Sequence, residues 1–168
     1  MARVLVGVTG GIAAYKACEL VRLFVRSGHE VVPLVTPGAD RFVRAETFHA
    51  LARRKPEAEL YPHLQRADLY VIAPLTANTL AKLAYGIADN VVAETALAHD
   101  GPVLVAPAMN VRMWQHPATR ANVETLRSRG IEFVGPAKGE LAEGEEGVGR
   151  MAEPAEVFER AQELLGAS

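Results

Sequence analysis

VLVGVTGGIAAYKACELVRLFVRSGHEVVPLV, residues 4–35, is the stretch that decides the fold. Val4–Val8 and Val31–Val35 are runs rich in β-branched residues that end in turn residues. Between them, Ile12–Ser27 spaces its apolar residues as one face of a helix. A strand, a helix and a second strand in this order indicate a βαβ unit with parallel strands. The sequence therefore predicts a parallel β-sheet.

The same alternation continues along the chain. Further continuous apolar strands are expected at Leu69–Ala73, Val103–Ala106 and Ile131–Val134. Helical patterns separate them at Ala45–Arg54, Thr76–Tyr85, Val91–Ala98 and Ala118–Arg129, and a last helix is expected at Pro154–Leu165. Strands that are buried on both faces need helices on each side, so we expect an α/β fold of three layers in a single domain.

Composition excludes several classes of function. The chain has 168 residues, 49% of them hydrophobic, and a net charge of -2, which does not supply the clustered cations that bind nucleic acid. The single cysteine, Cys18, excludes a disulfide framework, and no metal site is expected. No run reaches the roughly 18 apolar residues that span a bilayer. We expect a cytoplasmic protein without nucleic-acid or membrane partners.

The turns after the strands are the places to search for a site, because ligands of open parallel sheets bind beyond the carboxyl ends of the strands. After the first strand, Gly10 and Gly11 let backbone N–H groups approach an anion, although glycine there can also be only a turn. The second strand ends at Thr36, where a dinucleotide site normally has an acid. This favours a mononucleotide, and the alternative is a threonine that starts a proline turn.

Two later turns and one histidine add candidates. Pro74–Thr79 places hydroxyl and amide groups at a helix start, where Thr76 can also be a plain N-cap. Pro107–Trp114 gathers methionine and amide side chains, which can instead be satellite core. His63 follows Pro62 just before the third strand and is a candidate general base, with an inert histidine as the alternative.

One segment does not fit the alternation of strands and helices. Residues 135–153 contain five glycines and show no apolar periodicity. A connection of this length is either a lid over a site or a disordered surface loop. We expect a mobile lid at about 135–153.

Together, these residues resemble the flavin-dependent cysteine decarboxylases. The resemblance rests on Gly10–Lys16, on the position of His63, and on Pro74–Thr79, which is similar to the family's P-A-S-A-N-T. Pro107–Trp114 matches the family's P-x-M-N-x-x-M-W in full, and Gly147–Pro154 resembles the branch that serves coenzyme A synthesis.

The resemblance implies a Rossmann-like, flavodoxin-type sheet with helices on both faces, as a single FMN-binding domain over residues 1–168. It also implies a homotrimer or dodecamer with active sites between subunits. The residues implied to hold FMN are Gly10, Gly11, Ile12, Thr36, Thr76, Ala77, Asn78, Thr79 and Ala108. Met109, Asn110 and Met113 would contact the substrate.

The implied activity is that of a carboxy-lyase that removes CO2 from an acylated cysteine, with 4'-phosphopantothenoylcysteine converted to 4'-phosphopantetheine. His63 would take the thiol proton and Asn110 would orient the carboxylate or the adjacent amide. Where much of that branch has a lid cysteine, this chain has Glu143, which is therefore a candidate proton donor. Since the domain is commonly fused to a ligase in bacteria, a separate ligase is an expected partner.

Three alternatives remain. Without a lid cysteine, the chain would act as a peptidyl-cysteine decarboxylase that stops at the oxidised ene-thiol. A flavin-binding regulatory subunit without turnover is the second, and the presence of both His63 and Asn110 argues against it. An NAD(P)-binding module is the third, and Thr36 disfavours it.

Overall fold

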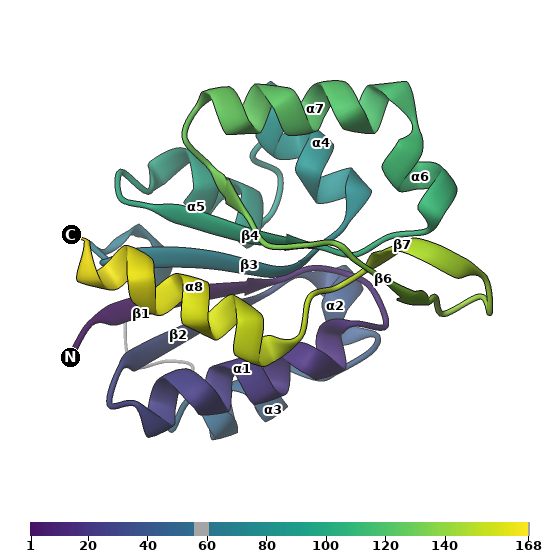
Figure 1. Cartoon of the computed structure of the whole chain (residues 1–168). Coiled ribbons are helices and arrows are strands. Elements are labelled where there is room, and N and C mark those ends of the chain that lie inside the picture. Colours follow the sequence, from purple (N-terminus) through teal and green to yellow (C-terminus); the bar gives the residue numbers. More distant parts are fainter. Residues whose placement is uncertain (56–60, 168) are drawn as a thin grey trace.

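The computed structural model describes residues 1–55 and 61–167, so positions 56–60 and 168 of the predicted domain lie outside the described residues. Five parallel strands form the central sheet, in the order β2-β1-β3-β4-β5 (Figure 1). They are β1 (Arg3–Val8), β2 (Glu30–Val35), β3 (Leu69–Leu75), β4 (Val103–Pro107) and β5 (Glu132–Phe133). The predicted α/β fold with a parallel sheet is confirmed.

Helices cover both faces of this sheet (Figure 1). One face is covered by α1 (Ala14–Arg26), α3 (Ala45–Leu51) and α8 (Pro154–Gly166), and the other by α4 (Ala77–Tyr85), α5 (Val91–Ala98) and α7 (Pro117–Ser128). Three short helices, α2 (Pro37–Asp40), η1 (Pro62–Leu64) and α6 (Val111–Gln115), complete the set over the described residues. None of the helices in this part of the chain is long and apolar enough to cross a membrane.

The core has two parts because successive side chains of a strand point to opposite faces. In β1, Val4 and Val6 pack in the cluster under α1, α3 and α8, while Leu5 packs in the cluster under α4, α5 and α7. Each of these three side chains is fully buried. Apolar runs without alternation are therefore the expected signature of these strands.

Element ends differ from the predicted ones by a few residues. The helix predicted to reach Arg54 ends at Leu51, because Arg53 adopts a left-handed backbone with φ of 54°. The last strand is shorter than predicted, since it pairs only at Glu132 and Phe133, with Leu104 and Val105 of β4.

Residues 135–153 form a β-hairpin instead of an irregular loop. Strands β6 (Ala137–Glu140) and β7 (Glu146–Arg150) pair antiparallel, and the hairpin lies beyond the carboxyl end of the sheet, beside α6 (Figure 1). Its strands show no alternation of apolar and polar residues, because they pack on the turn at Met109 and Val111 and line a cleft, and do not pack on a hydrophobic core. Its mobility stays a prediction.

Candidate active site

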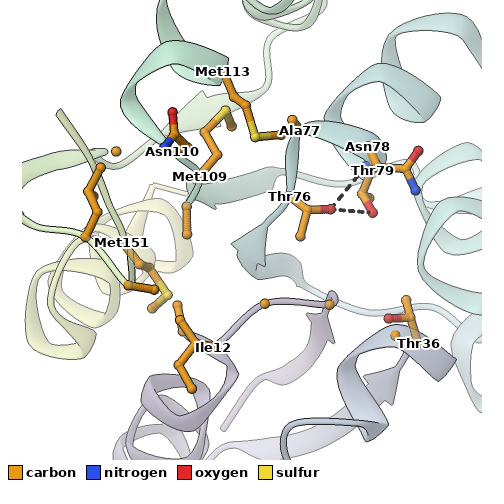
Figure 2. A pocket seen from close by; sticks show the side chains of 18 of the residues that line it. Ile12, Thr36, Thr76, Ala77, Asn78, Thr79, Met109, Asn110, Met113 and Met151 are labelled. Carbon is orange, nitrogen blue, oxygen red and sulfur yellow. Dashed lines mark hydrogen bonds between the residues drawn. The ribbon is translucent and has the colours of Figure 1, made fainter. Parts of the chain in front are cut away.

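A cleft of about 1100 Å³ lies at the carboxyl end of the sheet (Figure 2). This exceeds the roughly 300–1,000 Å³ of most small-molecule sites, which leaves room for a cofactor and a substrate. The turns after β1 to β4 and the hairpin β6–β7 line it. Of the predicted site residues, it brings together Gly10, Gly11, Ile12, Thr36, Thr76, Ala77, Asn78, Thr79, Ala108, Met109, Asn110, Met113 and Glu143.

The turn after β1 lies against the turn after β2. A Cβ atom added at Gly10 would lie 3.0 Å from the carbonyl carbon of Gly38, so the two backbones meet where a side chain would not fit. The turn then enters α1 through hydrogen bonds from Ala14 N–H to the carbonyl of Gly11 and from Lys16 N–H to that of Ala13. N–H groups ahead of a helix start are suited to bind an anion such as a phosphate.

The hydroxyls of Thr36 and Thr76 are helix caps that also line the cleft. Thr36 Oγ1 accepts from the N–H of Ala39 over 3.2 Å, and Thr76 Oγ1 accepts from the N–H of Thr79 over 3.3 Å. Thr36 is therefore the N-cap of α2, and Thr76 is the N-cap of α4. A capping hydroxyl accepts through its oxygen and keeps its own proton as a donor, so Thr36 can still donate to a ligand. Thr76 donates its proton to Thr79 Oγ1, and the hydroxyl of Thr79 then has its own proton for a ligand (Figure 2).

Thr9, which sequence reasoning did not single out, joins the first and third turns. Its buried hydroxyl donates to the carbonyl of Pro74 over 2.6 Å and accepts from the N–H of Thr76 over 3.0 Å. The start of α4 is thus tied to the end of β1. The signal that could have identified Thr9 in the sequence is its position, as a hydroxyl residue between the apolar first strand and Gly10.

The turn after β4 presents Asn110. Its Oδ1 accepts from the N–H of Arg112 over 2.8 Å and caps α6, which fixes the amide plane. Its Nδ2 donates to the carboxylate of Glu143 and, over 3.5 Å, to that of Glu145, both in the hairpin. Asn110 therefore binds a carboxylate in this structure.

The backbone of β7 lies directly on this turn. The N–H of Met109 donates to the carbonyl of Gly149 over 2.9 Å. A Cβ atom at Gly149 would lie 2.1 Å from the carbonyl oxygen of Met109, and one at Gly147 would lie 2.9 Å from Cγ2 of Val111. The glycines of the hairpin thus permit its approach to Asn110.

The two sides of the cleft differ in chemistry. Ile12, Met109, Met113 and Met151 lie on one side, and Thr36, Thr76 and Thr79 lie on the other (Figure 2). A flat aromatic ring carrying a phosphate ester has matching parts: thioether and alkyl groups pack on the ring, while hydroxyls and N–H groups bind the phosphate. The residues present therefore fit FMN.

Each cation that lines the cleft, within the residues described, is paired with a carboxylate. Buried Lys16 donates to Glu153 over 3.0 Å and to the carbonyl of Met151 over 3.1 Å; Arg150 also contacts Glu153, over 3.2 Å. The hydrogen bond from Lys16 lowers the pKa of Glu153. Lys82 likewise donates to Asp89 over 2.9 Å and lowers the pKa of Asp89. Anion binding here depends on N–H and hydroxyl donors.

His63 lies apart from the other predicted site residues. It belongs to η1 and lines a separate cavity of about 380 Å³ with residues that precede β3 and β4, at the amino end of the sheet. Its Nε2 lies 3.3 Å from Oε1 of Glu94. One copy of the chain does not bring His63 to Asn110.

Cys18, on α1, packs against the core and does not line the cleft. Burial raises the pKa of its thiol. Among residues 1–55 and 61–167, no three His, Cys, Asp or Glu side chains are placed to hold a metal ion.

Comparison with known proteins gives consistent matches. The model of one protein family, described as Flavoprotein, matches residues 1–166. The coenzyme A biosynthesis bifunctional protein CoaBC of Mycobacterium bovis is 46% identical over 172 residues, which cover 97% of this chain and 41% of that protein. The chain thus spans about two fifths of the length of this curated relative.

Two solved structures share the whole fold. A cysteine-to-serine mutant of PPC decarboxylase, complexed with pantothenoylaminoethenethiol, is 33% identical, with a TM-score of 0.86, over 99% of this chain and 98% of that one. The FMN binding protein AtHal3 is 32% identical, with a TM-score of 0.84, over 99% and 98% of the two chains.

Proposed function

This chain belongs to the Flavoprotein family, and from that premise we propose that it binds FMN and removes CO2 from an acylated cysteine, converting 4'-phosphopantothenoylcysteine to 4'-phosphopantetheine. The observation that carries this proposal is the amide of Asn110, which is fixed by its cap and bonded to a carboxylate at the cleft. The similarity to PPC decarboxylase over nearly the whole chain supports the same substrate.

FMN is held by the predicted cofactor residues. The N–H groups around Gly10 and Gly11 and the hydroxyls of Thr36 and Thr79 bind the phosphate side, and Ile12 packs on the ring. When bound, FMN supplies the acceptance and return of two electrons that the substrate needs in order to lose CO2.

Asn110 holds the carboxylate that leaves. In the structure its Nδ2 donates to the carboxylate of Glu143, and in the proposal the substrate carboxylate takes that place; the hydrogen bond from the N–H of Arg112 to Oδ1 orients the amide. Met109 and Met113, which line the cleft, pack beside the acylated cysteine. A fixed donor of this kind orients the substrate for reaction.

His63 takes the thiol proton in the site of a neighbouring copy of the chain. Within one copy it lies at the other end of the sheet, whereas its neighbours Tyr61 and Leu64 are large exposed side chains. Such a surface is suited to pack against another subunit. We propose a homotrimer or dodecamer with sites between subunits, as the resemblance to the cysteine decarboxylases implies.

Glu143 donates the proton that completes the reduced product. It lines the cleft next to Asn110 and stands where the related branch has a cysteine.

A second candidate function is the oxidative decarboxylation of a peptidyl-cysteine, with an ene-thiol as product. The observation that favours it is the charge of the hairpin, where Glu140, Glu143, Glu145 and Glu146 disfavour a phosphorylated substrate. The relative named as bifunctional has a second part beyond the 41% that this chain spans, which supports a separate protein as partner of the first function; we propose that this partner is the ligase that makes the substrate.

The experiment compares the two substrates on the FMN-loaded protein. Phosphopantothenoylcysteine and a peptide that ends in cysteine are each incubated with it, and the products are weighed by mass spectrometry. The proposal predicts loss of CO2 from phosphopantothenoylcysteine and a saturated thiol as product. Loss of CO2 from the peptide alone, with an ene-thiol product, supports the second candidate; a protein that takes up no FMN contradicts both.

A further inference from the structure

The tip of the hairpin β6–β7 places a carboxylate of the chain itself on Asn110. Glu143 accepts from Asn110 Nδ2, and Glu145 lies 3.5 Å from the same nitrogen. Glu145 is also 3.9 Å from the guanidinium of Arg112. Glu143 forms no ion pair among the described residues, so the amide of Asn110 is its main polar partner there.

The position of Glu143 is built into the hairpin. A tight turn forms through hydrogen bonds from Leu141 N–H to the carbonyl of Glu145 over 2.8 Å and from Gly144 N–H to that of Leu141 over 2.9 Å. The side chain of Leu141 is buried, and Gly149 is bonded to Met109. The turn is therefore anchored on both sides, and its carboxylate is delivered to Asn110.

We propose that Glu143 is an internal competitor for the substrate carboxylate and thereby determines which ligands the site accepts. The inference rests on the proposed function, in which that carboxylate also binds Asn110 Nδ2. Glu143 and Glu145 already bring two carboxylates to this nitrogen, so the carboxylate of a ligand would be a third negative charge and would be repelled at short distance. A ligand with a carboxylate must therefore displace Glu143, whereas a ligand without one leaves the contact intact.

This competition also orders the reaction. Binding of substrate frees Glu143 from Asn110, and loss of CO2 makes the amide available to it again. Its return restores the contact between the hairpin and Asn110.

The first test measures binding by calorimetry to the FMN-loaded protein. The two probes are N-pantothenoyl-alanine, which keeps the carboxylate but lacks the thiol, and N-pantothenoyl-ethylamine, which lacks both. We expect Glu143→Ala to tighten binding of the first probe about three- to tenfold and to leave the second unchanged. Glu143→Gln keeps an acceptor without the charge and gives an intermediate gain.

Glu146→Gln is the matched control, because it removes the same charge from β7 at an exposed position. It should bind both probes as the wild type does. A gain with Glu143→Ala that is equal for the two probes, or no gain for either, overturns the competition. If Glu146→Gln tightens binding of the first probe as much as Glu143→Ala does, the effect comes from the net charge of the hairpin, and this also overturns the competition.

The second test needs no ligand. Hydrogen exchange of the amides of residues 137–150 should be several-fold faster in Glu143→Ala and unchanged in Glu146→Ala, because only the first loses the contact with Asn110. Unchanged exchange in Glu143→Ala overturns the internal contact. If exchange changes as expected but neither probe binds the wild type, the proposed function fails and the competition with it, while the contact stands.

Discussion

Gly149 and Met109 meet backbone to backbone: the N–H of Met109 donates to the carbonyl of Gly149 over 2.9 Å, and a Cβ atom at Gly149 would lie 2.1 Å from the carbonyl oxygen of Met109. Through this contact the hairpin β6–β7 lies on the turn that carries Asn110. The absence of a side chain at Gly149 is therefore a condition for the closed arrangement of the site.

Gly149→Ala should lift the hairpin from this turn. We expect faster hydrogen exchange at the Met109 amide and at least about tenfold slower decarboxylation, with a loss of about 1–3 kcal/mol in the free energy of unfolding, as for other overpacked sites. Gly166→Ala, at the end of α8, meets no atom within 4 Å and is the control. Wild-type exchange and turnover in Gly149→Ala would refute the role of this contact.

Thr9→Val should weaken FMN binding without unfolding the chain. The methyl group cannot accept from the N–H of Thr76, and a buried donor left without a partner costs about 1–3 kcal/mol, so the turn that carries Thr76 should shift. We expect the dissociation constant for FMN to rise about tenfold, as measured by fluorescence titration. Thr9→Ser keeps both hydrogen bonds and should bind FMN as the wild type does; equal affinity of Thr9→Val would contradict this.

Gly11→Asp tests the placement of the phosphate. A Cβ atom at Gly11 meets only the methyl group of Thr76, at 4.0 Å, so the fold accommodates a side chain there. A negative charge beside the proposed phosphate position should nevertheless reduce flavin occupancy in the purified protein. Gly11→Ala adds the Cβ atom without the charge and should keep most of its flavin. Equal occupancy in the wild type and Gly11→Asp would show that the phosphate lies elsewhere.

The contact between Lys16 and Glu153 predicts a pH dependence of stability. The hydrogen bond from Lys16 lowers the pKa of Glu153 from its ordinary value of 4.5. A depressed acid stabilises the fold at pH values above its pKa in the unfolded chain, and this stabilisation is lost as the pH falls through the lower pKa of the folded chain.

Glu153→Gln should therefore lower the free energy of unfolding near neutral pH, and its difference from the wild type should disappear as the pH falls below about 4. Urea unfolding at several pH values measures this. Glu159→Gln, at an exposed position of the same helix, is the control and should follow the wild type. A difference between wild type and Glu153→Gln that stays constant in acid would exclude the ion pair as its origin.

Much of the fold and most of the cleft were predictable from the sequence, for a local reason. Strands buried on both faces are continuous apolar runs, as in Leu69–Ala73, and the residues after such strands must meet at one edge of a parallel sheet. Gly10, Thr76 and Asn110 were found in this way, and all three line the cleft.

What sequence reasoning missed depends on contacts between distant segments. The hairpin β6–β7 has no apolar alternation, because its glycines pack on the turn at Met109 and Val111 instead of in a core. Thr9 has the pattern of an ordinary turn residue until its partner Thr76 is known. His63 precedes β3 whereas Asn110 follows β4, so the predicted parallel sheet already carried the signal that the two lie at opposite ends of it.

The most direct test of the central claim is the release of labelled CO2 from phosphopantothenoylcysteine that carries carbon-13 in the cysteine carboxyl group. Asn110→Asp is the decisive comparison, because an aspartate can still accept from the N–H of Arg112 and cap α6 but cannot donate to a carboxylate. We predict release of the label by the FMN-loaded wild type, and retained FMN with release at least about a hundredfold slower in Asn110→Asp. No release by the loaded wild type, or equal release by both proteins, would contradict the account.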